Sequence, residues 1–431
     1  MIIAVLGSGG REHAIAWALA KSPRCEKLYV LPGNGGTAAI AENVEGVDID
    51  NGEEVLAFVR AHAVDLVVIG PEAPLVAGVA DTLRAAGVLV FGPDAQGAQL
   101  EGSKTYSKRF MQENGIPTAA YGTFTEAAPA VQYVRDMGAP IVVKADGLAA
   151  GKGVIVAQTV EEAVDAVSDC FEGAFGKAGS RVVVEECLTG PECSLLAFVT
   201  GGHAFCMATA QDHKRAYDGD EGPNTGGMGV YSPVPIVTDD ELAAMTEVME
   251  TAAAATAKEP FAHDYRGVLY GGFMLTPAGP KVLEFNARFG DPETQVVLPR
   301  LDADLADIMV AVAEGKPEDV HLAWRDDEWA VCVVLASQGY PKAYEKGKKI
   351  TGIEAAEELP GVTVFHAGTK RDENGDLVTA GGRVLNVVAL GATFEDARAR
   401  AYEACDRIDF EGKQFRSDIG LKAAHGRSSW E

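Results

Sequence analysis

The chain has 431 residues, of which 47% are hydrophobic and 7% aromatic, and its formal net charge is −26 at pH 7. This length predicts roughly two to four domains, at about 150 residues per domain. The acidic balance argues against binding to nucleic acid or to anionic membranes, because those surfaces require a basic footprint. No apolar run approaches the roughly 20 residues that a membrane helix needs.

The seven cysteines are scattered along the chain, and no two form a CxxC pair. An odd number without that spacing predicts neither a disulfide framework nor a zinc site. The chain opens on a predicted strand, residues 2–6, with no basic segment before it, so we expect no signal peptide. We therefore expect a cytoplasmic protein.

Strands and helices alternate over residues 1–100. The hydrophobic pattern predicts strands at 2–6, 27–31, 65–69 and 88–91, and helices at 12–21, 53–61 and 77–86. Such alternation predicts a parallel sheet covered by helices, that is, a Rossmann-like α/β domain. Glycine-bearing turns follow the strands at 7–10, 32–36, 70–72 and 92–93. Ligands bind at this edge of open α/β sheets, so we expect a substrate there.

Residues 101–322 follow a different pattern, which predicts a second domain. After a helix at 103–114, strands rich in β-branched residues at 140–145, 154–157 and 181–185 predict a small α+β lid over about residues 118–190. The TDDE sequence at 238–241 has capping-box spacing and predicts the start of a helix. Residues 267–275 and 280–286 predict a hairpin.

Residues 323–431 predict a third domain of the α+β class. Its expected elements are strands at 329–336 and 383–390, a turn at 372–376 and a helix capped by Thr393.

The first glycine turn, residues 7–12 (GSGGRE), leads directly into a helix. Free N–H groups and the helix dipole at such a turn favour phosphate. A dinucleotide fingerprint would have a third glycine where Glu12 stands, and an acid after the next strand, which ends in PGN at 32–34. A small sugar phosphate therefore fits better than the dinucleotide of a dehydrogenase. A turn required only by packing is the alternative.

A second glycine loop, residues 144–153 (KADGLAAGKG), lies between two predicted strands. It is not a Walker A loop, because three residues separate Gly147 from Gly151 and no Ser or Thr follows Lys152. The pattern predicts a flap whose N–H groups close over phosphates. An apolar hairpin with a mobile turn is the alternative.

Three polar residues alternate along the last strand of the predicted hairpin. Since alternate residues share a face, Glu284, Asn286 and Arg288 are expected to point the same way. Carboxylate and amide oxygens suit a hard cation such as Mg²⁺, and a guanidinium suits an oxyanion. A solvated strand face with a chance salt bridge is the alternative.

A long polar segment, residues 211–229, combines basic residues at its start with a glycine-rich continuation. Long loops in compact domains are often functional. We expect Lys214 and Arg215 to steady a phosphate group; a disordered tip is the alternative.

The run RFGDPETQ at 288–295, with GSGGREH at 7–13 and RSDIG at 416–420, resembles the glycinamide ribonucleotide synthetases. These are ATP-grasp ligases of purine biosynthesis, and the resemblance extends over essentially the whole chain. It implies ATP-dependent joining of glycine to 5-phosphoribosylamine through glycyl phosphate, with Mg²⁺ or Mn²⁺. We expect these small molecules as the only partners, no nucleic acid or membrane partner, and a monomer.

The resemblance also implies roles for individual residues. Those expected around ATP are Lys104, Lys144, Gly151, Lys152, Gly153, Glu185, Glu186, Leu188 and Glu192. Those expected around phosphoribosylamine are Gly9, Gly10, Arg11, Asn34, Gly35 and Glu72, with Arg11 on the phosphate. Glu284 and Asn286 would hold the metal. The catalytic residues would be Arg288, Lys214, Arg215 and Asp291.

Two other classes of protein compete with this interpretation. Another ATP-grasp ligase, similar to biotin carboxylase or to aminoimidazole ribonucleotide carboxylase, would share the lysines, the flap, Glu284 and Asn286. The RFGDPETQ and GSGGREH runs favour glycine and phosphoribosylamine. A nucleotide-binding regulator without turnover is the second, and the polar row with two separate anion sites argues against it.

Overall fold

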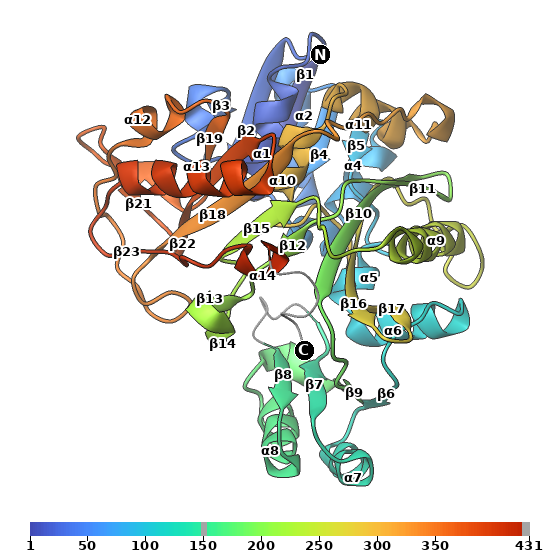
Figure 1. The fold of residues 1–431 in the computed structure, drawn as a ribbon. Coiled ribbons are helices and arrows are strands. Elements are labelled where there is room, and N and C mark those ends of the chain that lie inside the picture. The colour runs from blue at the N-terminus through green and yellow to red at the C-terminus, as the bar shows by residue number, and fades with distance from the viewer. Residues whose placement is uncertain (148–152, 425–431) are drawn as a thin grey trace.

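The computed structural model describes residues 1–147 and 153–424. Its N-terminal part is a parallel sheet of order β3-β2-β1-β4-β5, drawn in blue in Figure 1. The strands are β1 (Ile2–Gly7), β2 (Lys27–Pro32), β3 (Glu42–Asn43), β4 (Leu66–Ile69) and β5 (Leu89–Phe91). The helices are α1 (Gly10–Leu19), α2 (Gly52–His62), α3 (Glu72–Val76) and α4 (Val79–Ala85). The expected parallel α/β arrangement is confirmed.

The helix predicted at 77–86 is shorter than expected, and a second helix precedes it. Gly78 has a φ of +81° and separates α3 from α4. A left-handed backbone interrupts a right-handed helix, and glycine adopts it without steric penalty. The break leaves Glu72 at the start of α3, beyond the carboxyl end of β4.

The lid is an antiparallel sheet of order β6-β9-β7-β8, and it projects from the bottom of the molecule in Figure 1. It comprises β6 (Tyr121–Phe124), α7 (Ala127–Met137), β7 (Ile141–Ala145), β8 (Val154–Ala157), α8 (Val160–Phe171) and β9 (Val182–Glu186). Both helices pack in one hydrophobic cluster with the sheet, in which Val143, Val182 and Val184 are fully buried. The lid therefore has a core of its own.

A second antiparallel sheet, of order β11-β10-β16-β17, lies between the lid and the N-terminal part. Its strands are β10 (Glu192–Thr200), β11 (His203–Cys206), β16 (Gly267–Thr276) and β17 (Gly279–Asn286). Accompanying helices are α5 (Gln99–Gly102), α6 (Lys104–Glu113), α9 (Asp239–Thr256), α10 (Thr294–Val297) and α11 (Leu305–Glu314). The predicted β16–β17 hairpin and the capping box at Thr238 are both present.

The C-terminal sheet has the order β12-β15-β18-β22-β19, with β23 paired to β18. Its strands are β12 (Gln211–Asp212), β15 (Gly229–Ser232), β18 (Trp329–Ser337), β19 (Val362–His366), β22 (Arg383–Gly391) and β23 (Lys413–Gln414). The helices here are α12 (Ile353–Glu357), α13 (Phe394–Arg407) and α14 (Leu421–Ala424). Two hairpins complete this part: β13 (Arg215–Tyr217) with β14 (Glu221–Asn224), and β20 (Thr369–Arg371) with β21 (Leu377–Thr379). Because β12 and β15 precede the predicted C-terminal region by about 100 residues, the polar segment 211–229 is anchored on a sheet built mostly from the end of the chain.

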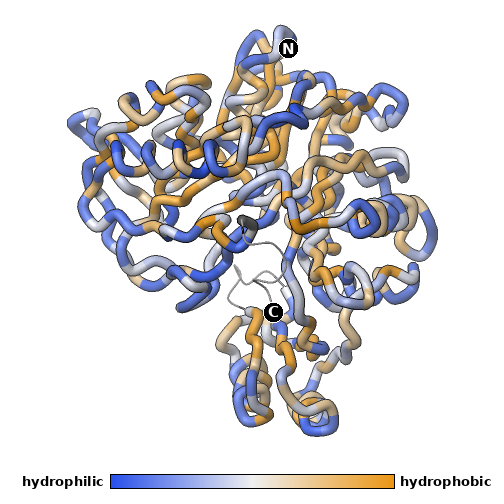
Figure 2. The backbone as a smooth tube through the Cα atoms, viewed as in Figure 1, coloured by the Kyte–Doolittle hydropathy of each residue, from blue (hydrophilic) through white to orange (hydrophobic). Residues whose placement is uncertain are grey.

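Hydrophobic residues concentrate along the central strands, whereas the outer helices and loops are largely hydrophilic (Figure 2). One buried cluster joins Ile3 of β1, Phe198 of β10 and Cys332 of β18, all with no exposed surface. The N-terminal, middle and C-terminal parts therefore share a core. Within the described residues, no helix combines the length and the apolar character needed to cross a membrane.

Candidate functional site

Glu284 and Asn286 lie together at the end of β17. Nδ2 of Asn286 donates to Oε1 of Glu284 at 3.4 Å, as alternation along the strand predicts. Burial alone would raise the pKa of Glu284, but Lys214, Lys144 and Lys104 together lower it. The carboxylate is therefore ionised and stands among three ammonium groups. Such a set suits a polyphosphate accompanied by a divalent cation.

The protein supplies only part of a metal site here. Within the described part of the chain, no three His, Cys, Asp or Glu side chains gather closely enough to hold a metal ion. A cation between Glu284 and Asn286 would complete its shell with phosphate oxygens and water, which is how Mg²⁺ is usually bound.

Arg288 lies two residues beyond the end of β17 at Asn286. The alternation of burial continues through it, because Asn286 and Arg288 are half-buried whereas Ala287 and Phe289 are buried. The Arg288 guanidinium is 2.8 Å from Glu101 and 3.6 Å from Glu72, and it also donates to the Phe289 carbonyl. These carboxylates further raise the already high pKa of Arg288, although burial opposes this. Arg288 thus joins the N-terminal part to the end of β17.

A buried ion-pair cluster lies where the lid meets the second sheet. The Glu185 carboxylate on β9 contacts both Lys144 and Lys108, and Lys144 also donates to the Leu283 carbonyl at 3.3 Å. Lys104 donates to the Gly147 carbonyl at 3.0 Å, at the start of the predicted flap. No sequence motif marks Lys108. It follows Lys104 by four residues on one helix, and residues at that spacing share a face, so this spacing is the pattern that could have identified it.

The predicted flap falls partly outside the described residues, and Gly151 and Lys152 are among those outside. Gly153 is described, and its carbonyl accepts a hydrogen bond from Ala145 at 2.8 Å, which extends the β7–β8 pairing by one residue pair toward the loop.

The predicted adenine-binding segment connects β9 to β10. Glu186 is exposed; its carboxylate accepts from the Ala120 N–H at 3.3 Å and lies 3.6 Å from Lys281. Leu188 lies in the connection itself. Glu192 begins β10 and is paired with Lys214 at 2.9 Å. The sequence-predicted nucleotide and catalytic residues thus meet at this point.

The neighbouring loop residues Lys214 and Arg215 have side chains in different environments. Glu192 and Asp212 raise the pKa of Lys214 well above its ordinary value, although burial opposes this, so Lys214 stays charged. Arg215 is exposed and donates to the Gly222 carbonyl across its own hairpin at 2.7 Å. The structure therefore brings Lys214 to Glu284 and Glu192, and it does not bring the Arg215 guanidinium with it.

The first turn is occupied by a carboxylate of the chain itself. The Gly9 N–H donates to Oε2 of Glu12 at 2.6 Å, which forms the capping box of α1. The other oxygen of Glu12 pairs with Nε of Arg11 at 2.6 Å, and Nη1 of Arg11 donates to the Phe289 carbonyl at 3.0 Å. The expectation of free N–H groups at this turn is therefore wrong for Gly9. Glu12, where a third glycine would stand, acts as the cap.

The second glycine turn is held against the C-terminal part. Nδ2 of Asn34 donates to the carbonyls of Ser8 at 2.9 Å and His366 at 2.8 Å. The Gly35 N–H donates to the Thr369 carbonyl at 3.2 Å. Both predicted substrate residues thus shape the turn through internal hydrogen bonds.

Two side chains of β22 that were not among the predicted site residues reach the same region. Arg383 donates to the carbonyls of Gly226 at 2.7 Å and Asp291 at 3.0 Å, and it lies 3.5 Å from the Asp291 carboxylate. The side-chain amide of Asn386 stands so close to Gly10 that a Cβ there would collide with it. Burial opposes the ionised form of Asp291, but Arg383 and Arg11 lower its pKa. The lack of any local motif around β22 explains why these residues were missed.

A hydrogen-bonded cluster lies beneath the RFGDPETQ run. Oε1 of Glu293 accepts from Tyr270 at 3.1 Å and from Ser194 at 3.4 Å, and all three side chains are buried. Burial, aided by the charges of Glu293 and Glu192, raises the pKa of nearby Asp212 to about 7, although Lys214 opposes this. Carboxyl groups therefore surround Lys214 on several sides.

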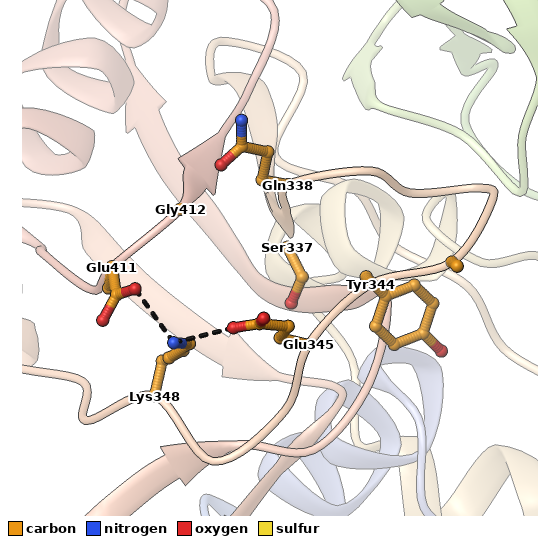
Figure 3. Close-up of a pocket in the computed structure, with 8 residues that line it drawn as sticks. Ser337, Gln338, Tyr344, Glu345, Lys348, Glu411 and Gly412 are labelled. Atoms are coloured by element: carbon orange, nitrogen blue, oxygen red, sulfur yellow. Dashed lines mark hydrogen bonds and ion pairs between the residues drawn. The ribbon is translucent and has the colours of Figure 1, made fainter.

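A pocket of about 410 Å³ opens in the C-terminal part (Figure 3). Its lining residues are Ser337, Gln338, Ala343, Tyr344, Glu345, Lys348, Glu411 and Gly412. Lys348 lies between Glu345 at 2.8 Å and Glu411 at 2.9 Å. The residues described around this pocket include none of the predicted site residues, so we assign it no part in the chemistry.

Comparison with known proteins identifies the family. The phosphoribosylglycinamide synthetase N, ATP-grasp (A) and C domains match residues 1–101, 102–294 and 330–422. Proteins called phosphoribosylamine–glycine ligase are similar over 98% of this chain: one from Brucella melitensis is 50% identical over 98% of its own length, and one from Agrobacterium fabrum 52% over 99%.

Solved structures agree. The crystal structure of phosphoribosylamine–glycine ligase from Thermotoga maritima has a TM-score of 0.84 and 36% identity, covering 97% of this chain and all of that one. Biotin carboxylase from Campylobacter jejuni has a TM-score of 0.75 but only 15% identity, covering 96% of this chain and 92% of that one, and so shares the fold alone. The chain belongs to the phosphoribosylglycinamide synthetase family.

Proposed function

We propose that this protein joins glycine to 5-phosphoribosylamine at the expense of ATP, giving glycinamide ribonucleotide, ADP and phosphate in purine biosynthesis. The observation that carries the proposal is Glu284, an ionised carboxylate beside Asn286 and among Lys104, Lys144 and Lys214. The chain is also about 50% identical to proteins called phosphoribosylamine–glycine ligase, over nearly their full length.

The nucleotide would lie between the lid and the second sheet. Lys104 and Lys144 suit the phosphates, and Gly151, Lys152 and Gly153 would close over them as a flap. For the adenine we propose Glu185, the carbonyl of Glu186 and the N–H of Leu188, and for the ribose hydroxyls Glu192. Glu185 is held by two buried lysines, which supports a fixed position at the hinge.

Glu284 and Asn286 would hold Mg²⁺ or Mn²⁺. When bound, the cation neutralises phosphate charge and orients the phosphates for in-line transfer. Both protein donors are oxygen ligands, which fits either ion.

The reaction would proceed in two steps. A glycine carboxylate oxygen attacks the γ-phosphorus of ATP, and the bond to the bridging oxygen breaks, which gives glycyl phosphate and ADP. The amine of phosphoribosylamine then attacks the activated carbonyl carbon; phosphate leaves, and the amine loses a proton. The protein contributes mainly positioning and charge stabilisation.

The charged residues around β17 divide this work in our proposal. Lys214 and Arg288 would stabilise the charge of the transferring phosphoryl group and of the glycine carboxylate, with Arg215 at the margin of the site. Asp291 would bind the glycine ammonium; its lowered pKa supports an ionised carboxylate. The pairing of Arg288 with Glu101 and Glu72 fixes the direction of its remaining donors.

Phosphoribosylamine would lie along the two glycine turns, against Gly9, Gly10, Asn34, Gly35 and Glu72. Arg11 would contact its phosphate through donors other than Nε and the Nη1–H that already bind Glu12 and Phe289. A guanidinium has five N–H donors, so these contacts leave capacity for an anion.

For the organisation of the chain we propose domains at residues 1–100, 101–322 and 323–431, with the lid at about 118–190. We propose that the protein acts as a cytoplasmic monomer. Its partners would be glycine, 5-phosphoribosylamine and ATP.

The direct test is ADP release by the purified protein with MgATP, measured with glycine, with freshly formed phosphoribosylamine, with both and with neither. Release that requires both acceptors supports the proposal. Release that ignores both would contradict the choice of substrates. It would direct the search to other carboxylate–amine ligases.

A further inference from the structure

Residues 416–422 contact the polar loop that carries Lys214. This loop runs from Asp212 at the end of β12 to Gly229 at the start of β15, with the β13–β14 hairpin at its tip. Figure 1 shows α14, in red, beside β12, β13 and β14, in green, although about 200 residues separate them in the sequence. We call residues 416–422 the C-terminal strap.

Arg416 is the centre of the contact, and its side chain is only 2% exposed. Its Nε and Nη2 donate to the two oxygens of Asp418 at 2.7 and 2.8 Å, a bidentate pair within the strap. Its Nη1 donates to Asp220 at 2.8 Å and to the Arg215 carbonyl at 3.1 Å, both in the loop. One guanidinium thus holds the loop at the start of β13 and in the turn that follows this strand.

Further bonds fix the tip of the loop to the strap. The Gly219 N–H donates to Asp418 at 2.9 Å, and the Asp218 carboxylate accepts from the Ser417 N–H at 2.8 Å. Lys422 pairs with Asp220 at 2.5 Å. Charge-assisted hydrogen bonds of this kind are the stronger ones in proteins, because one partner is ionised.

The base of the loop is held next to Lys214 itself. Nε2 of His213 accepts from the Gly420 N–H at 3.0 Å, and the opposite ring nitrogen lies 3.3 Å from the Gly229 carbonyl. This pattern requires a neutral ring with its proton on Nδ1. His213 therefore links strap and loop one residue before Lys214.

We propose that the C-terminal strap positions Lys214 for the ligase reaction, with Arg416 as the positioning residue. Arg416 touches no proposed substrate; it acts by ordering the loop, so that the Lys214 ammonium is presented to Glu192 and Glu284 before substrates arrive. Preorganisation of this kind raises turnover, because a charged group that must first be ordered contributes less to the transition state. The inference rests on the proposed ligase function.

The first experiment measures the order of the loop without any substrate. Amide hydrogen exchange of residues 213–222 is compared in the wild type, Arg416→Met, Arg416→Lys and Arg407→Met. Arg407 is the matched control, because it donates to the Ala355 carbonyl and to Glu403, away from the loop. In Arg416→Met we expect exchange of the Gly219 amide and its neighbours to be ~10-fold faster or more, since charge-assisted bonds are lost. Lysine keeps the positive charge but cannot form the bidentate hydrogen bonds of a guanidinium. The exchange rate in Arg416→Lys should therefore lie between those of the wild type and Arg416→Met.

The second experiment measures kcat and KM on the same variants. We expect kcat of Arg416→Met to fall roughly 10- to 100-fold, because a small displacement of a charged group in the site has effects of this size. KM for phosphoribosylamine should change little, since the strap does not touch the glycine turns. Arg407→Met should keep wild-type kcat.

Because Arg416 is buried, its loss could prevent folding, so a second variant is included. Asp218 is exposed at the loop tip, and Asp218→Ala removes two hydrogen bonds to Ser417. Asp218→Ala should also speed amide exchange in the loop and lower kcat, each by a smaller factor than Arg416→Met.

Unchanged exchange in folded Arg416→Met, or in Asp218→Ala if the former does not fold, would overturn the proposal. So would faster exchange with wild-type kcat. If the wild type makes no glycinamide ribonucleotide, the proposed function fails instead. The exchange result then still decides whether the strap orders the loop.

Discussion

The Nζ atom of Lys108 lies 2.5 Å from the Glu185 carboxylate, and both side chains are only 3% exposed. Lys108 comes from α6, whereas Glu185 comes from β9 of the lid. Lys144 of β7 contacts the other carboxylate oxygen. The pair therefore joins the lid to the body of the protein at the proposed adenine hinge.

Lys108→Met should destabilise the protein, because it leaves Glu185 buried with one partner. We expect the free energy of unfolding to fall by about 3 kcal/mol, as when one partner of a buried ion pair is removed. Denaturant unfolding measures this. Arg24→Met is the control: its ion pair with Asp307 is exposed, so its loss should change stability by less than ~1 kcal/mol. Equal effects of the two variants would contradict the structural role of Lys108.

Glu284→Gln should fold normally and lose most turnover. The amide is isosteric but neutral, and it cannot balance the charge of a divalent cation among three lysines. We expect kcat to fall at least ~100-fold, in line with the loss of one transition-state electrostatic contact. The exposed lid residue Glu161, changed to Gln, is the control. Near wild-type kcat of Glu284→Gln at saturating Mg²⁺ would rule out the metal assignment.

Arg11→Ala should raise KM for phosphoribosylamine by roughly 10-fold or more, because a charge-assisted contact to the phosphate is lost. The bond to the Phe289 carbonyl predicts a smaller fall in kcat as well, since the first turn would lose its tie to the RFGDPETQ run. Steady-state kinetics with each substrate varied separates the two effects. Arg60→Ala, on the exposed face of α2, is the control. An unchanged KM would show that Arg11 is purely structural.

Buried histidines should lower stability as the pH drops below about 6.5, and His13 and His366 form a pair among them that can be tested. Nδ1 of His13 accepts from the His366 N–H at 2.8 Å, so the ring must stay neutral there. Burial, with the neighbouring His366, lowers the pKa of His13 to about 3, and burial lowers that of His366 to about 4. Both pKa values are below those of the unfolded chain. The stabilisation is thus complete above the unfolded pKa and declines as pH falls, since only the unfolded chain takes up protons.

Between pH 6.5 and 5, each histidine should account for up to about 2 kcal/mol of the loss. Denaturant unfolding at pH 7 and pH 5 measures it, and His13→Gln should show a smaller difference than the wild type. The control is His203→Gln, since His203 is exposed. In this variant the difference between the free energies of unfolding at pH 7 and pH 5 should equal that of the wild type. If His13→Gln behaves like the wild type, the ring is not the source of the pH dependence.

Local patterns predicted the elements well where they depend on neighbours in the chain. The capping spacing at Thr238 and Thr393, the alternation along β17 and the turn at 372–376 are all found in the structure. One difference also has a local cause: the helix predicted at 77–86 begins only at Val79, after Gly78 with its left-handed backbone.

The candidate site could be predicted only as a set of residues. Sequence patterns single out Lys144, Lys214 and Glu284, the family resemblance adds Lys104, and the structure brings the four together. Arg383 and Arg416 could not be assigned a role, because each acts on a loop more than 150 residues away. Glu12 stands where a dinucleotide fingerprint has its third glycine, and only the structure shows that its carboxylate accepts a hydrogen bond from the Gly9 N–H.

The sequence by itself determined the α/β class, the order of the elements and the family, because short-range patterning and motifs are properties of neighbouring residues. Only the tertiary structure decided which charges are paired and which stay available for a substrate. Pairing depends on distances between strands far apart in the chain, and the energy of a charge depends on its burial. The partners of Arg11, Glu185 and Arg416 are therefore properties of the fold.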